Sequence, residues 1–164
     1  MVDEKDATTY AYYKMSESVH DQIRAATAEL HLLFVHATEH VLMNPDKYWR
    51  YFDFPADYWP MALKSFEKKE LSLVGRFDFS ISDRGVKCYE YNADSASCLF
   101  ECGFMQESFM KACHQSEGVD GGAETAGAVT AAWRTRFEDD DGVKNPVVHF
   151  MCDGSDSEEL YHMA

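Results

Sequence analysis

The sequence predicts an α+β (α/β) fold in which an antiparallel β-hairpin and one further strand pack with long helices. Three observations support this prediction. Apolar residues recur at helical spacing from Ser16 to Met43. A later stretch, from Leu71 to Ala93, alternates residue by residue as strands do, and a turn signal interrupts it. An apolar segment near the end of the chain has the length of a buried strand.

The first helix is expected from about Ser16 to Met43, because Asn44-Pro45 ends the periodic run. His36 and His40 lie four residues apart along it, a spacing that can bind a metal. No glutamate is arranged as in a zinc protease motif, so solvent-facing or capping histidines are the simpler interpretation. The apolar positions of this helix are Val19, Ile23, Ala26, Leu30, Leu33, Phe34, Ala37 and Val41.

Further helices are expected on both sides of the alternating stretch. The aromatic segment Tyr48 to Pro55 should pack across the first helix. A second helix is predicted from Ala56 to Glu70, with Pro60 tolerated near its first turn. Two more helices are predicted from Leu99 to Gln115 and from Ala128 to Phe137.

The remaining segments connect these elements or end the chain. Residues 116–127, Ser116 to Gly127, are rich in Gly, Ser and acids and are expected to form a flexible inserted loop. Pro146 to Cys152 is predicted to be a buried strand, and a turn at Asp153 to Asp156 follows it. Glu158 to Ala164 is expected to begin a helix. We expect residues 1–164 to form a single partial domain.

The alternating stretch is predicted to be a hairpin with strands at Leu71 to Ile81 and Val86 to Ala93. Between them Asp83-Arg84-Gly85 suits a three-residue loop with Gly85 in the left-handed conformation. Ser82 would then pair with Val86, and this pairing defines the register of the whole hairpin.

In that register four polar side chains share one face of the hairpin. Asp78 lies opposite Glu90, and Arg76 lies opposite Asn92, while the neighbouring aromatic rings point to the other face. Two carboxylates and an amide are oxygen ligands that suit Mg²⁺, and an arginine can hold a phosphate in a fork. The alternative is an ordinary solvent-exposed hairpin face, on which these residue types are common.

After the hairpin, the small polar residues of Asp94-Ser95-Ala96-Ser97 lead into the helix expected from Leu99. Such a loop can present hydroxyls and backbone N–H groups to an anion. It can equally be an ordinary helix cap, and both interpretations remain open.

Composition and charge narrow the classes of partner. With 164 residues, 46% of them hydrophobic, the chain is long enough to bury a core. Its net charge of −14 argues against nucleic acid or an anionic membrane as partner and favours a cationic small molecule.

The five cysteines are odd in number and form no CxxC pair, which predicts reduced thiols and argues against zinc. We find neither an apolar run of about 20 residues nor a signal peptide, so a cytoplasmic protein is expected.

At the hairpin the sequence resembles the synthetase part of the glutathionylspermidine synthetase and trypanothione synthetase family of ATP-grasp ligases. The resemblance rests on the run Arg76-Phe77-Asp78-Phe79 followed by Glu90-Tyr91-Asn92-Ala93-Asp94-Ser95, and then on Ser97 and Leu99-Phe100-Glu101. It extends more loosely from the region of Trp59 to the Val148-His149-Phe150 segment. The combination of both runs at this interval is far more specific than the first run alone.

The resemblance implies an ATP-dependent carboxylate–amine ligase that joins glutathione to spermidine through an acyl phosphate, with Mg²⁺ and ATP as cofactors. Asp78, Glu90 and Asn92 would be the metal ligands, and Arg76 would contact the transferred phosphoryl group. Ser95 and Ser97 would position glutathione. The acidic pair Glu158 and Glu159 would lie near the polyamine.

This sequence also departs from the family pattern. It lacks the region expected to hold adenine and the nucleotide-binding lysines, so it should be a fragment, the pre-ATP-grasp-like part of the enzyme, inactive by itself. The cysteine amidase domain of many relatives is absent too, so none of the cysteines should be a catalytic nucleophile. The alternative function is an acidic, non-catalytic module that binds a polyamine or another cation.

Overall fold

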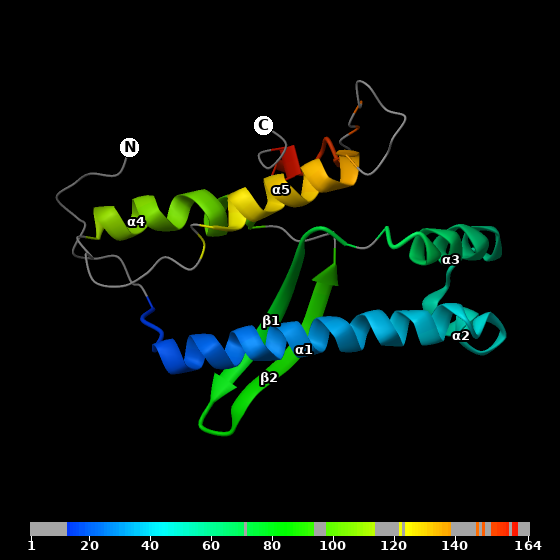
Figure 1. The fold of residues 1–164 in the computed structure, drawn as a ribbon, viewed down its shortest axis with the longest axis horizontal. Coiled ribbons are helices and arrows are strands. Elements are labelled where there is room, and N and C mark those ends of the chain that lie inside the picture. Colours follow the sequence, from blue (N-terminus) through cyan, green and yellow to red (C-terminus); the bar gives the residue numbers. More distant parts are fainter. Residues whose placement is uncertain are drawn as a thin grey trace. The chain divides into compact units, whose positions relative to one another are not determined.

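The computed structural model describes residues 13–70, 72–93, 98–113, 122, 124–138, 147, 149, 152–157 and 159–160. The chain divides into two compact units. One contains Tyr13–Ser72 and Phe77–Asn92, which are the N-terminal helices and most of a β-hairpin, and the other includes Leu73–Arg76 and Ala93–Ala164 (Figure 1). The helices together with an antiparallel two-stranded sheet confirm the α+β class.

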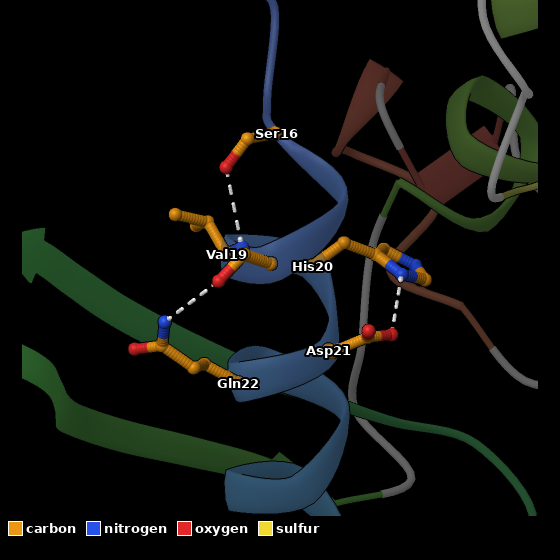
Figure 2. A network of polar contacts seen from close by, with 6 residues as sticks. Ser16, Val19, His20, Asp21 and Gln22 are labelled. Atoms are coloured by element: carbon orange, nitrogen blue, oxygen red, sulfur yellow. Dashed lines mark hydrogen bonds and ion pairs between the residues drawn. The ribbon is translucent and has the colours of Figure 1, made fainter.

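The longest helix, α1, spans Glu17–Leu42 and confirms the helix expected from Ser16 to Met43. Ser16 caps it, because its hydroxyl accepts a hydrogen bond from the backbone N–H of Val19 at 3.3 Å (Figure 2). The acidic Glu17 in the first turn also complements the positive end of the helix dipole. The sequence therefore defines both ends of α1 locally.

A short helix that was not predicted, α2, follows at Pro45–Phe52. Pro45 lies at its first positions, where the fixed φ of proline suits a helix start and the missing N–H costs no hydrogen bond. The Asn-Pro pair that ends α1 therefore also begins α2. The expected packing of this aromatic segment across α1 is only partial: Tyr48 contacts His40, whereas Tyr51 is 81% exposed. The helical turn directs successive rings to different sides.

The helix predicted from Ala56 to Glu70 forms in two parts, a 3₁₀ turn, η2, at Ala56–Tyr58 and the α-helix α3 at Trp59–Glu67. Pro60 lies in the first turn of α3, as expected. The helix stops short of Glu70 because Lys69 adopts a left-handed φ of 58°.

The indole of Trp59 connects α3 to α1. Its Nε1 donates a hydrogen bond to the backbone carbonyl of Leu42 at 3.1 Å. That carbonyl belongs to the last turn of α1, where no intrahelical donor is available, so the bond satisfies an acceptor that the helix itself leaves open.

The predicted hairpin is formed by β1 at Gly75–Ser82 and β2 at Gly85–Ala93, which pair in a two-stranded sheet. Gly85 has a φ of +97°, which confirms the left-handed position expected at the turn. Among the described residues, the strand expected from Leu71 begins at Gly75, and Leu71 itself lies outside them.

The helix predicted from Leu99 to Gln115 is present from Leu99 to Ala112, and Cys113 after it lies in a turn. It contains a π-helical segment, η3, at Glu101–Met105, which continues into α4 at Gln106–Ala112. A π-helical segment adds a residue to the turn and changes the direction in which later side chains point. The end of the prediction, at Gln115, lies outside the described residues.

The helix predicted from Ala128 to Phe137 is longer than expected and forms α5 at Thr125–Glu138. The loop expected over residues 116–127 therefore ends early, because Gly127 lies within α5. A Cβ placed on Gly103 of η3 would lie 3.8 Å from the Cβ of Ala126, so small residues allow these two helices to approach closely.

Near the end of the chain only part of the predicted structure can be compared. Val147, His149 and Cys152 lie outside any strand, and the other residues of the strand expected from Pro146 lie outside the described residues. A buried strand needs a neighbouring strand, and the sheet order of the described residues contains β1 and β2. Of the helix expected from Glu158 to Ala164, the described residues Glu159 and Leu160 are helical, as is Ser157 just before it.

Burial is slight throughout the described residues, among which Cys113, 8% exposed, is the one buried apolar side chain. Large apolar side chains such as Leu32 and Trp49 are half or more exposed. The five cysteines all lie within the described ranges and form no disulfide there, and their reduced state stays a prediction. No helix in the described part of the chain has both the length and the apolar character needed to cross a membrane.

Candidate metal-binding hairpin

The hairpin has an aromatic face and a polar face, as alternation along its strands predicts. On the aromatic face, Phe77 of β1 and Tyr91 of β2 stack with ring centroids 4.0 Å apart and planes 8° from parallel. Phe79 stacks on Phe77 at 5.6 Å, so the three rings share one side of the sheet. Helix α1 covers this side through Phe34, whose ring lies 6.0 Å from Phe77 and 5.3 Å from Tyr91 (Figure 1).

The stacked rings define the register, because only side chains directly opposite each other on paired strands bring their rings this close. Moving one residue along each strand places Asp78 opposite Glu90 on the polar face. This agrees with the pairing of Ser82 and Val86 expected from the turn.

Glu90 and Asn92 are joined directly on the polar face. The amide Nδ2 of Asn92 donates a hydrogen bond to Oε1 of Glu90 at 2.8 Å. This bond orients the Asn92 amide so that its nitrogen serves the carboxylate, and its oxygen is the atom that can bind a cation. Glu90 is exposed, whereas Asp78 and Asn92 are half-buried, so the face is accessible from solvent yet partly shielded.

Like charges opposite each other destabilise a sheet, by about 0.2–1 kcal/mol for a directly opposed pair. Two facing carboxylates therefore favour a nearby positive charge. Oxygen ligands of this kind, two carboxylates and one amide, match the preference of Mg²⁺, which keeps several waters besides its protein ligands. Among the described residues no group of three His, Cys, Asp or Glu side chains could hold a metal. The candidate set on the hairpin is of a different kind, because its third member is the amide of Asn92.

Arg76 lies in β1, half-buried, two residues before Asp78 and therefore on the same side of that strand. It belongs to the end of β1 that groups with the second compact unit. Its pairing with Asn92 and its contact with a phosphoryl group stay predictions.

The other predicted site residues fall near or beyond the limits of the description. Ser95, Ser97 and Glu158 lie outside the described residues. Glu159 is described, and its Oε2 accepts a hydrogen bond from the backbone N–H of Asp153. This contact closes the turn before the terminal helix, which is a local structural role. A polyamine-binding role for Glu159 stays a prediction.

The turn that Glu159 closes also holds an ionised carboxylate. Oδ1 of Asp153 accepts hydrogen bonds from the hydroxyl of Ser155 at 2.6 Å and from its backbone N–H at 2.8 Å. These two donors, the hydroxyl first, lower the pKa of the Asp153 carboxyl below its ordinary value. The turn at Asp153 is thus stabilised by its own hydrogen bonds.

Histidines of α1 lie close to polar side chains of other residues. The pair expected to face solvent or to cap behaves so: His36 is exposed with its Nδ1 3.6 Å from Oε2 of Glu39, and Nε2 of His40 lies 3.1 Å from the hydroxyl of Tyr48. Sequence reasoning missed His31, whose Nδ1 lies 3.1 Å from the hydroxyl of Tyr91. Its spacing of three residues from Phe34 is the signal that could have placed it on the covered face.

The chain belongs to the family described as "Glutathionylspermidine synthase preATP-grasp", whose model matches residues 3–164. This membership agrees with the α+β architecture and with the family resemblance found at the hairpin.

Individual relatives carry synthetase names. The "Bifunctional glutathionylspermidine synthetase/amidase" of Escherichia coli (strain K12) is 36% identical over 154 residues, which cover 93% of this chain and 24% of the relative. The protein of the same name from Shigella flexneri has the same identity and coverage. The "Trypanothione synthetase" of Crithidia fasciculata is 34% identical over 160 residues, or 95% of this chain and 23% of the relative. The chain therefore spans about a quarter of the length of these relatives.

Proposed function

We propose that this chain is the part of an ATP-dependent C–N ligase that supplies a metal-binding hairpin, and that the ligase joins the glycyl carboxylate of glutathione to an amine of spermidine. The observation that supports the proposal best is the set Asp78, Glu90 and Asn92 on one face of a hairpin whose register is defined by the stacked rings. Family membership and the synthetase names of the relatives support the reaction class.

The proposed reaction has two steps. A carboxylate oxygen of glutathione attacks the terminal phosphorus of ATP, which forms an acyl phosphate and releases ADP. The spermidine amine then attacks the acyl carbon, so that an amide forms, phosphate leaves and a proton is released. The barrier is largely electrostatic, because a carboxylate must approach a polyphosphate.

The chain's own residues address that repulsion. Asp78, Glu90 and Asn92 would hold Mg²⁺, which neutralises negative charge on the phosphates when it is bound. Arg76 would hold an oxygen of the transferred phosphoryl group through its guanidinium. Ser95 and Ser97 would orient the glycyl end of glutathione, and Glu158 and Glu159 would attract the polyamine cation.

A chimera tests the proposal directly. The segment of the Escherichia coli relative that matches this chain is replaced by this chain, and ADP release and amide formation are measured with glutathione, spermidine, ATP and Mg²⁺. The chimera should be active, and Asp78→Asn or Glu90→Gln should each reduce its rate by on the order of 100-fold or more. Asp83→Asn, a matched change in the exposed hairpin loop, should leave the rate unchanged. Undiminished amide formation in both site variants would reject the metal assignment.

The net charge of −14 favours a second candidate, an acidic module that captures spermidine or another cation without chemistry. Calorimetry distinguishes the two functions. Spermidine binding that is independent of Mg²⁺ and nucleotide, and that weakens steadily with added salt, would support simple electrostatic capture.

A further inference from the structure

One contact connects the aromatic face of the hairpin to a residue far away in the sequence. Nδ1 of His31, in the middle of α1, lies 3.1 Å from the phenolic oxygen of Tyr91, and 60 positions separate the two residues. Their rings also meet edge to face, with centroids 6.0 Å apart at 86°. Both side chains are half-buried, where a hydrogen bond is shielded from competing water.

Tyr91 lies between two of the candidate metal ligands. Because side chains alternate along a strand, its ring points to α1 while Glu90 and Asn92 point to the opposite face. Any rotation of β2 about its own axis that moves the ring must therefore move both ligands in the opposite direction. By holding the Tyr91 side chain, the hydrogen bond to His31 therefore also limits how the side chains of the polar face can move, because the backbone of Tyr91 joins them.

We infer that His31 is a positioning residue, which holds Tyr91 and thereby keeps β2 in the rotation that presents Glu90 and Asn92 to a divalent cation. The inference rests on the proposed metal-binding function of the hairpin.

The hairpin needs such a support. An isolated two-stranded sheet is at best marginally stable in water, and packing against a helix is one way to stabilise it. Here α1 supplies that packing through Phe34 and His31. The apolar ring contacts resist separation of the helix from the sheet, but they are tolerant of small rotations. The directional hydrogen bond between His31 and Tyr91 is the contact that restricts rotation.

The same helix offers a matched control. His40 and Tyr48 form a second histidine–tyrosine pair, with Nε2 3.1 Å from the phenolic oxygen and ring centroids 5.6 Å apart. This pair connects α1 to α2 and involves no strand residue. Removing the His40–Tyr48 contact changes α1 in a similar way but removes no contact of the hairpin.

The test measures binding of Mn²⁺ alone to the full chain, followed by electron paramagnetic resonance. Tyr91→Phe removes only the hydroxyl and keeps the ring stack on Phe77. His31→Ala removes the partner, and His31→Asn retains a polar atom near the position of Nδ1. Tyr91→Phe and His31→Ala should each raise the Kd for Mn²⁺ by about 3- to 10-fold, at the low end of the effect of groups that orient metal ligands. His31→Asn should restore most of the affinity.

The control variants His40→Ala and Tyr48→Phe should change the Kd by less than about 2-fold, since distant sites act independently. Wild-type binding of Mn²⁺ with an unchanged Kd in Tyr91→Phe would overturn the positioning role and leave the metal site intact. Equal weakening by the control pair would also overturn it, because the effect would then belong to α1 in general. A wild-type chain that binds no Mn²⁺ would overturn both the metal site and this inference.

Discussion

Phe77 and Tyr91 stack across the hairpin with ring centroids 4.0 Å apart, on the face opposite Asp78 and Glu90. A slip of one strand by one residue would move all of its side chains to the other face, which would turn its carboxylate towards α1 and expose its ring. The aromatic pair therefore protects the register of the polar face. The geometry of the candidate site depends on residues that would touch no ligand.

The turn provides a first prediction. Gly85 has a φ of +97°, and no atom lies within 4 Å of a Cβ placed there, so Gly85→Ala is strained by its backbone alone. It should lower the free energy of unfolding by about 1–2 kcal/mol in chemical denaturation. Gly127→Ala, inside α5 and equally uncrowded, should instead stabilise by about 0.5–1 kcal/mol. Equal effects at both positions would contradict the left-handed turn.

A second prediction concerns the contact between α1 and the hairpin. Phe34 touches both Phe77 and Tyr91 but is 39% exposed. Phe34→Ala should therefore cost about 1–2 kcal/mol in denaturant unfolding, less than the 3–5 kcal/mol typical of a fully buried ring. Its neighbour Leu33 is 58% exposed, and Leu33→Ala should cost less than about 0.5 kcal/mol. A larger loss from Leu33→Ala would mean that a different face of α1 is covered.

The N-terminus of α1 allows a third prediction. Ser16 accepts a hydrogen bond from the N–H of Val19 (Figure 2), so Ser16→Ala leaves that donor without its side-chain partner. The variant should lose about 1 kcal/mol of stability and some helical circular dichroism. Ser18→Ala, two positions further inside the helix, should be neutral or slightly stabilising because alanine favours helix. A neutral Ser16→Ala would show that the cap does not limit the helix.

A fourth prediction concerns pH. The hydroxyl of Ser155 is the first cause that lowers the pKa of Asp153 below its ordinary value of 3.8, so Ser155→Ala should raise that pKa towards 3.8. Carboxyl carbon NMR during a pH titration measures it, with Ser157→Ala as the control. Because the folded pKa is lowered, the stabilisation is present above the unfolded value and is lost as pH falls through the folded value. An unshifted Asp153 in the Ser155→Ala variant would contradict the hydrogen-bonded turn.

Local signals predicted several elements well. The ends of α1 follow from a capping serine and an Asn-Pro pair, and the hairpin turn follows from a glycine that can adopt a positive φ. The periodicity of α1 indicates only that the Asn-Pro pair ends a helix and does not predict α2, although proline is equally suited to begin one. Local sequence indicates which conformations a residue allows, and an Asn-Pro pair allows both the end of one helix and the start of the next.

The candidate site also has one part that local sequence predicts and one part that it does not. Alternation and the turn alone predicted that Asp78, Glu90 and Asn92 share a face, since side-chain direction along a strand depends only on position. That Tyr91 would be held by His31 could not be predicted, because the two residues are 60 positions apart and nothing local indicates which helix face meets the sheet. The sequence by itself determined the order of the candidate ligands along the hairpin. Tertiary packing of α1 decided what supports them, because a contact between distant segments depends on how the chain folds back on itself.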